Sequence, residues 1–139
     1  MKTKAPKYKY RSVMLIDDNE IDNFINERLV KAYYFAENVY VHTSTKSALE
    51  FLKNIEVTIS EMPVELIPSY ILLDINMPIL DGFHFLEEFE KFSEKLRNQI
   101  KIVMLTTSLN PLDTEKSKSY KNVVKFLHKP LTESELAEL

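Results

Sequence analysis

Four predicted strands of this sequence end in polar or charged side chains that could take part in chemistry. These residues are Asp17 and Asp18, Asp74, Thr106, and Lys129. Carboxylates that lie close together repel one another, so a group of acids favours a bound cation. Because oxygen ligands without histidine or cysteine suit a hard ion, we expect Mg²⁺ here. A carboxylate beside Mg²⁺ can attack phosphorus and form an aspartyl phosphate, whose oxygens a lysine and a hydroxyl can hold.

The apolar pattern predicts the elements that must position these residues. Strands are expected at residues 11–17, 38–43, 70–74, 100–106 and 123–127, mostly as continuous apolar runs. Five helices are expected. The first spans residues 20–34, the second follows a cap at Ser44 or Thr45, and the third runs from residue 83 to before residue 100. The fourth begins at Asn110-Pro111 and runs to residue 120, and the fifth begins with a capping box at Thr132. The apolar stripes of the first and third helices are expected in the core. Residues 54–69 are predicted to form a loop, because Pro63 and Pro68 interrupt any long element.

Strands that alternate with helices and are apolar on both faces indicate a parallel sheet covered on both sides. We therefore predict an α/β fold, a doubly wound five-stranded parallel sheet with helices on both faces. In such sheets, ligands bind beyond the carboxyl ends of the strands, where the strand order reverses. The acids, the threonine and the lysine are all expected at that edge.

The composition narrows the classes of function. The 139 residues match one domain, predicted to span residues 11–139 after a flexible basic leader at 1–10. The net charge of −3 argues against a nucleic-acid partner. No apolar run is long enough for a bilayer, so we expect a soluble protein without a membrane partner, and the absence of cysteine fits the cytoplasm. Gly82 is the sole glycine, which excludes glycine-rich phosphate loops.

The same glycine is expected to supply the backbone conformation of a turn. Asp81 is expected to cap the helix that follows this turn.

Four motifs, in order along the chain, resemble the response-regulator receiver domain of two-component signalling. They are Met-Leu-Ile-Asp-Asp at 14–18, Leu-Leu-Asp-Ile-Asn-Met-Pro at 72–78 with Asp-Gly at 81–82, the strand end at Thr106, and Lys-Pro-Leu at 129–131. The resemblance runs from about Arg11 to the C-terminus and implies a CheY-like, flavodoxin-like fold. It also implies that Asp74 is the phosphoacceptor. Its partners in binding Mg²⁺ would be Asp17, Asp18 and the backbone carbonyl of Asn76.

The same resemblance implies roles for residues of the last two strands. Thr106 corresponds to the switch hydroxyl, Lys129 to the phosphate-binding lysine, and Phe126 to the aromatic residue that turns inward on activation. The family implies that Asp74 receives its phosphoryl group from a histidine kinase or phosphotransfer protein, and that the ensuing conformational change alters binding to an unknown downstream protein. No output domain follows, so we expect a single-domain regulator and not an enzyme. Thr107 stands where the family often has a smaller residue, which predicts slowed phosphate loss.

Two alternatives stay open. A phosphohydrolase of the haloacid dehalogenase type also uses Asp, Lys, Thr and Mg²⁺, but it needs a second acid two residues after its nucleophile, where this chain has Asn76. A receiver fold that serves only as an unphosphorylated docking module is the other alternative. The intact acids, Thr106 and Lys129 argue against it.

Overall fold

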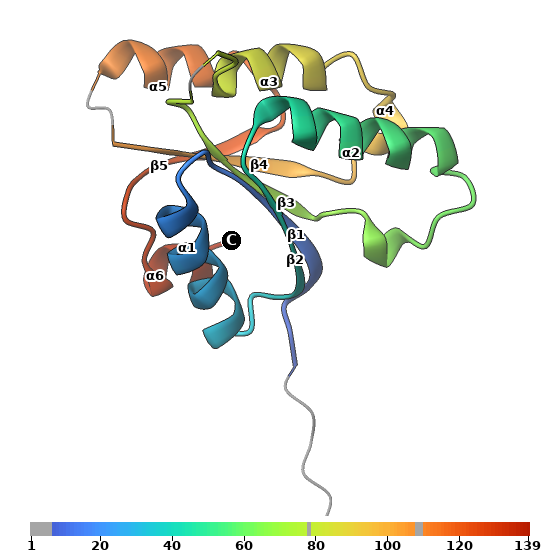
Figure 1. Ribbon diagram of the computed structural model, residues 1–139, viewed down its shortest axis with the longest axis horizontal. Helices are drawn as coiled ribbons and strands as arrows, with labels where there is room; N and C mark the ends of the chain where they lie inside the picture. Colours follow the sequence, from blue (N-terminus) through green and yellow to red (C-terminus); the bar gives the residue numbers. More distant parts are fainter. Residues whose placement is uncertain (1–6, 78, 108–109) are drawn as a thin grey trace, which may run out of the picture.

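The computed structural model describes residues 7–77, 79–107 and 110–139, so residues 1–6 of the predicted leader lie outside it. Within these ranges, five parallel strands form one sheet in the order β2-β1-β3-β4-β5 (Figure 1). The strands are β1 (Tyr10–Ile16), β2 (Ala36–His42), β3 (Tyr70–Asp74), β4 (Lys101–Thr106) and β5 (Val123–His128). Each lies within two residues of its predicted range at either end. The predicted fold class is confirmed, with the strand order reversing between β1 and β3.

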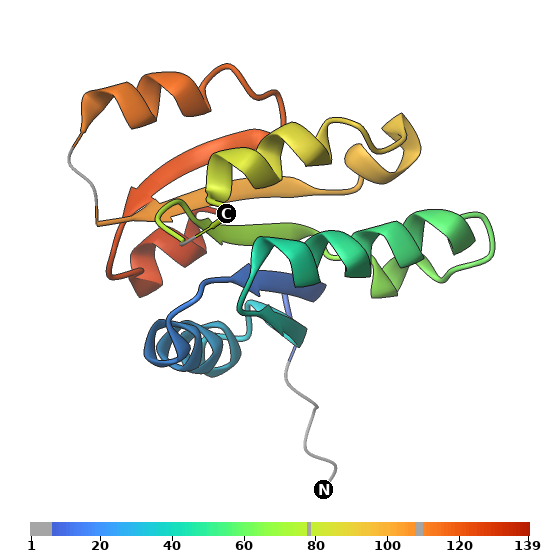
Figure 2. The ribbon, with the colours of Figure 1, turned by 45° about the horizontal axis from the view of Figure 1, so that its top comes forward.

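Helices cover both faces of the sheet, as Figures 1 and 2 show. On one face lie α1 (Glu20–Ala32) and α6 (Glu133–Ala137). On the other face lie α2 (Thr45–Thr58), α3 (Gly82–Phe89), α4 (Glu94–Arg97) and α5 (Pro111–Ser117). A short 3-10 helix, η1 (Val64–Leu66), precedes β3.

Successive side chains of the central strands enter two separate cores. In β1, Met14 and Ile16 pack on the face covered by α2 and α3, whereas Val13 and Leu15 pack on the face covered by α1 and α6. These four side chains are at most 1% exposed. Burial of apolar surface on both faces is the main force that holds a parallel sheet between its helices. It also fixes the register, since a slip of one residue would exchange the two faces.

The predicted loop at residues 54–69 is wrong at its start, because α2 continues to Thr58. Ile55 is buried and extends the helical face formed by Ala48 and Leu52, so it belongs to a period of 3.6 and not to a strand. The alternation of Ile55 with Val57 and Ile59 resembles a strand only locally. Helix α2 ends before the prolines, and η1 occupies part of the remaining connection.

The helix predicted from residue 83 to before 100 is interrupted. Helix α3 ends at Phe89, and Ser93 caps the separate helix α4 by accepting a hydrogen bond from the Leu96 backbone N–H at 3.3 Å. Phe92 and Leu96 are both buried in the same core as α3. The break lets the chain turn while keeping its apolar side chains inside.

The expectation that the apolar stripe of the first helix lies in the core is wrong for three of its four residues, since only Leu29 packs against the core. Ile21, Phe24 and Ile25 are 69%, 61% and 50% exposed. The buried residues of α1 are Asn23, Asn26 and Val30. The Asn23 side-chain N–H donates to the Asp17 backbone carbonyl at 2.8 Å, and this hydrogen bond offsets part of the cost of burying the amide.

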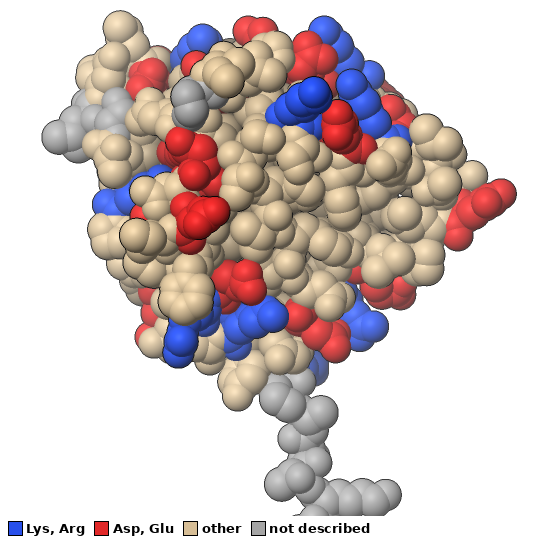
Figure 3. Space-filling model, viewed as in Figure 1, with Lys and Arg blue, Asp and Glu red and all other residues tan. Residues whose placement is uncertain are grey.

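No helix in the described ranges is both long and apolar enough to cross a membrane. On the face shown in Figure 3, acidic and basic side chains are interspersed among uncharged ones. This face therefore has no continuous basic surface of the kind that attracts nucleic acid.

Gly82 is required for a different reason than predicted. Gly82 does not have a positive φ. The left-handed conformation in this turn belongs to Ile79, with φ of 70°. A Cβ on Gly82 would lie 2.7 Å from the Asp74 carbonyl oxygen and 3.0 Å from the Ile75 Cα. The glycine therefore allows α3 to begin directly against the end of β3. The predicted cap is confirmed, since Asp81 accepts a hydrogen bond from the His84 backbone N–H at 2.9 Å.

Replacing Gly82 by Ala should destabilise the protein by about 1–3 kcal/mol, the usual cost of overpacking. The added methyl group would push against backbone atoms, which cannot rotate away. Urea unfolding followed by circular dichroism measures the difference. Ile79→Gly serves as the comparison, since it relieves a left-handed conformation and should not destabilise. An equal loss in both variants would contradict the close-approach explanation.

Candidate phosphoryl-acceptor site

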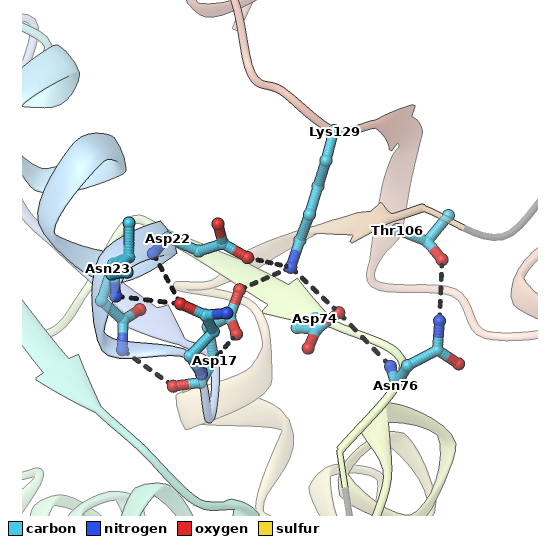
Figure 4. A network of polar contacts seen from close by, with 9 residues as sticks. Asp17, Asp22, Asn23, Asp74, Asn76, Thr106 and Lys129 are labelled. Carbon is cyan, nitrogen blue, oxygen red and sulfur yellow. Dashed lines mark hydrogen bonds and ion pairs between the residues drawn. The ribbon is translucent and has the colours of Figure 1, made fainter.

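The carboxyl ends of the strands bring the sequence-predicted site residues together, as Figure 4 shows. Asp17 follows β1, Asp74 ends β3, Thr106 ends β4 and Lys129 follows β5. All five parallel strands point the same way, so residues far apart in sequence meet at one edge. This convergence is the arrangement expected from the sequence.

Three acids form the floor of the site. Asp17, Asp18 and Asp74 each place a carboxylate oxygen within 4.8 Å of the others. Asp17 and Asp74 are buried, whereas Asp18 is exposed. Buried carboxylates without enough positive charge are unfavourable. An all-oxygen set of this size fits a hard divalent cation such as Mg²⁺, which prefers few carboxylates and completes its shell with water.

Lys129 supplies the positive charge that faces these acids. Its ammonium lies 2.7 Å from Asp17 Oδ2, 2.9 Å from Asp22 Oδ2 and 3.4 Å from Asp74 Oδ1. The lysine side chain is only 14% exposed. Its backbone N–H donates to the Thr106 carbonyl at 2.8 Å, which continues the pairing of β4 with β5 one residue beyond the strand.

The acidity of Asp74 reflects its surroundings. Burial and, to a smaller extent, the charge of Asp17 raise the pKa of its carboxyl, and Lys129 and the Asn76 backbone N–H oppose them, with a net change from 3.8 to about 6. Burial alone would lower the pKa of Lys129, but hydrogen bonds to Asp17 and Asp22 and the charge of Asp74 raise it above its usual value. The site therefore holds a charged lysine beside a carboxyl group whose ionised form a further cation would stabilise.

Asn76 links the end of β3 to the end of β4. Its backbone N–H donates to Asp74 Oδ1 at 3.3 Å, and its side-chain N–H donates to the Thr106 hydroxyl at 3.4 Å (Figure 4). Thr106 is fully buried. Its hydroxyl is thus connected to Asp74 through a single residue, which is a route by which a change at Asp74 can reach β4.

Two further residues singled out from the sequence lie around this centre. Phe126 is half-buried in β5, packs against the core on the α2 and α3 face, and contacts His128 edge-on at 5.9 Å between ring centres. Thr107 is exposed and lines a hollow of about 280 Å³ with Lys129, Ile25 and other residues of α1 and of the segment after β5.

Asp22 is a site residue that the sequence reasoning missed. It lies in the first turn of α1, and its carboxylate reaches back to Lys129. The signal was present, because the first turn of a helix that follows a strand directly lies over the carboxyl edge of the sheet. An acid there, five residues after Asp17, was a candidate for the same cluster.

Together, the fold and the site define an α/β domain whose acids and lysine suit a divalent cation and a phosphoryl group. A family model described as the response regulator receiver domain matches residues 13–139. The chain belongs to the response regulator receiver domain family.

Individual relatives agree with this assignment. The chain is 30% identical over 125 residues to the probable methanogenesis regulatory protein FilR2 of Methanothrix harundinacea, covering 89% of this chain and 75% of FilR2. A two-component response regulator from Cytophaga hutchinsonii superposes with a TM-score of 0.81 at 30% identity, over 94% of this chain and 93% of that one. CheY4 of Vibrio cholerae shares the fold, with a TM-score of 0.67 at 22% identity over 93% and 94% of the two chains.

Replacing Asp74 by Asn should stabilise the protein without divalent cations at pH 7.5 by about 1–3 kcal/mol. The folded-state pKa of about 6 lies above the ordinary 3.8. Between these values the folded protein binds more protons than the unfolded chain, so the contribution of Asp74 to stability falls as the pH rises. Urea unfolding with a chelator at pH 7.5 and at pH 4 measures the effect, and the gain should shrink at pH 4. A gain that is absent, or equal at both pH values, would contradict this electrostatic account.

Proposed function

We propose that Asp74 accepts a phosphoryl group from a phosphohistidine on a histidine kinase or phosphotransfer protein, and that the modified protein signals through altered binding to a downstream protein. The observation that supports this most is the position of Asp74, a buried carboxylate that shares one sheet edge with two acids and the Lys129 ammonium. A receiver domain generally interacts with phosphoryl-donating kinases and with downstream targets. For this chain we propose the class of the donor, a protein that carries a phosphohistidine, and a protein as the downstream target.

In the proposed transfer, a carboxylate oxygen of Asp74 forms a bond to phosphorus. The bond from phosphorus to the donor imidazole nitrogen breaks, and its electron pair remains on that nitrogen. Asp17, Asp18, Asp74 and the backbone carbonyl of Asn76 would hold Mg²⁺. When bound, Mg²⁺ supplies positive charge that offsets the charge on the phosphoryl oxygens.

Lys129 and Thr106 would stabilise the product. Lys129 is already 3.4 Å from Asp74, so its ammonium is within reach of phosphoryl oxygens placed there. The Thr106 hydroxyl would exchange its contact with Asn76 for a phosphoryl oxygen. Such a movement of β4 would alter the packing of Phe126, which we propose turns inward. The surface of α5, β5 and α6 would then present a changed face to the downstream protein.

The exposed side of α1 supports a protein as the phosphoryl donor. Ile21, Phe24 and Ile25 gather solvent-exposed apolar surface on the helix that starts at the site, and Ile25 lines the same hollow as Lys129. Exposed apolar groups of this kind are typical of protein contacts. A donor that covers them would bring its phosphohistidine next to the acids.

The phosphohydrolase alternative has less support. At position 76, where that chemistry needs a second acid, an asparagine donates a hydrogen bond to Thr106. We therefore propose that the reaction modifies the protein itself and that no substrate is turned over in trans. A pure docking module would gain nothing from burying Asp17 and Asp74 beside one another.

Incubation of the protein with acetyl phosphate and Mg²⁺ should add the mass of one phosphoryl group to the wild type and none to Asp74→Asn. Intact-protein mass spectrometry measures both. A parallel assay with a generic phosphoester should give no steady hydrolysis. No mass gain in the wild type would favour the docking module, and sustained phosphoester hydrolysis would favour the phosphohydrolase.

Thr107→Ala should shorten the lifetime of the phosphorylated protein by about threefold, a small change in barrier height. Thr107 borders the hollow beside Lys129, so its removal widens the path of water to Asp74. The decay of phosphorylated protein after removal of the donor measures this rate. Phosphate loss that is as fast or faster in the wild type than in Thr107→Ala would exclude a shielding role.

A further inference from the structure

The three N–H donors of the Lys129 ammonium face three acids at unequal distances. The shorter contacts are to Asp17 at 2.7 Å and Asp22 at 2.9 Å, and the longest is to Asp74 at 3.4 Å. Figure 4 shows the lysine side chain extended, with its ammonium between α1 and the end of β3. The lysine is thus held more closely by the α1 side of the site than by the acid that would carry the phosphoryl group.

We propose that Asp22 is a positioning residue that competes with the phosphoryl group on Asp74 for Lys129 and thereby favours the unphosphorylated state. This inference rests on the proposed function, because it concerns how tightly the phosphoryl group is held. Asp17, Asp18 and Asp74 form the cluster that suits a cation, and Asp22 is not one of them in the described chain. When a cation engages Asp17, Asp22 is the acid that still faces the lysine from α1.

The backbone holds Asp22 in place for this role. The Asn19 side chain caps α1 by accepting hydrogen bonds from the Ile21 and Asp22 backbone N–H groups at 2.9 and 3.1 Å. The Asn23 side chain fastens the same turn to the Asp17 carbonyl at 2.8 Å. Because the backbone of this turn is fixed at both points, the Asp22 carboxylate can move only by side-chain rotation, and the lysine divides its hydrogen bonds between Asp22 and the other acids.

The strength of this competition is limited by solvent. The Asp22 side chain is 35% exposed and borders the hollow of about 280 Å³ beside Lys129. Water in that hollow screens the pair, so its influence corresponds to a partly exposed ion pair. Because a phosphoryl group carries a larger charge, it attracts the Lys129 ammonium more strongly than Asp22 does. The attraction of Asp22 for the ammonium still weakens the contact between Lys129 and the phosphoryl group. We expect the effect on phosphoryl binding to be about threefold.

Beryllofluoride, a non-covalent phosphoryl mimic, tests this competition at equilibrium. With saturating Mg²⁺, Asp22→Asn should bind it about threefold more tightly than the wild type, as followed by amide NMR spectra. Asp22→Ser, whose side chain is too short to reach the lysine, should behave in the same way. Glu20→Gln is the matched control, because it removes an exposed acid from the same helical turn and should leave the affinity unchanged.

Two readouts separate positioning from a general charge effect. In a Lys129→Gln background, Asp22→Asn should no longer change the affinity for beryllofluoride. Without beryllofluoride, the ¹⁵N signal of the Lys129 ammonium should shift in Asp22→Asn and stay in place in Glu20→Gln.

The outcomes distinguish this inference from the proposed function. If the wild type and Asp22→Asn bind beryllofluoride with equal affinity, the proposed role of Asp22 is overturned and Asp74 remains the acceptor. A gain in affinity that persists without Lys129 would also overturn it. Wild-type protein that binds no beryllofluoride and gains no phosphate from acetyl phosphate would overturn the proposed function, and this inference with it.

Discussion

The structure depends on the balance between the Lys129 ammonium and the acids that the sheet gathers around it. Parallel strands carry Asp17 and Asp74 to one edge and bury them there. Two buried carboxylates repel each other, and burial raises the pKa of Asp74 to about 6. Lys129 offsets this repulsion without removing it. A domain that keeps such a centre is more stable when further positive charge arrives, which links ion binding and phosphoryl transfer to the same constraint.

The rest of the fold holds these charges in place. The strand ends are fixed because β1, β3 and β4 are buried on both faces, and because Gly82 lets α3 begin against the Asp74 carbonyl. Asn23 ties α1 to the end of β1, and Ile21 and Phe24 are exposed next to the site. The contact between Asn76 and Thr106 couples the acceptor strand to its neighbour. The same edge of the sheet therefore positions the acids, carries the exposed apolar surface of α1 and connects Asp74 to β4.

Much of this arrangement was predictable from the sequence, because it depends on patterns within short segments. Continuous apolar runs predicted the strands, and the residues that end them predicted the cluster. The features that were missed depend on tertiary contacts. The buried residues of α1 include Asn23 and Asn26, which hydrophobic periodicity ignores. The need for Gly82 arises from a close backbone approach that only the folded chain reveals. Asp22 was missed because it lies in the first turn of α1 and does not end a strand, whereas the cluster was predicted from the residues that end the strands.

We propose that Asp74, and no other residue, carries the phosphoryl group. Borohydride reduces an aspartyl phosphate to homoserine, so treating the phosphorylated protein and sequencing its peptides by mass spectrometry locates the acceptor directly. Homoserine is expected at position 74 alone. Homoserine at position 17, 18 or 22, or a phosphorylated protein that yields none, would contradict it.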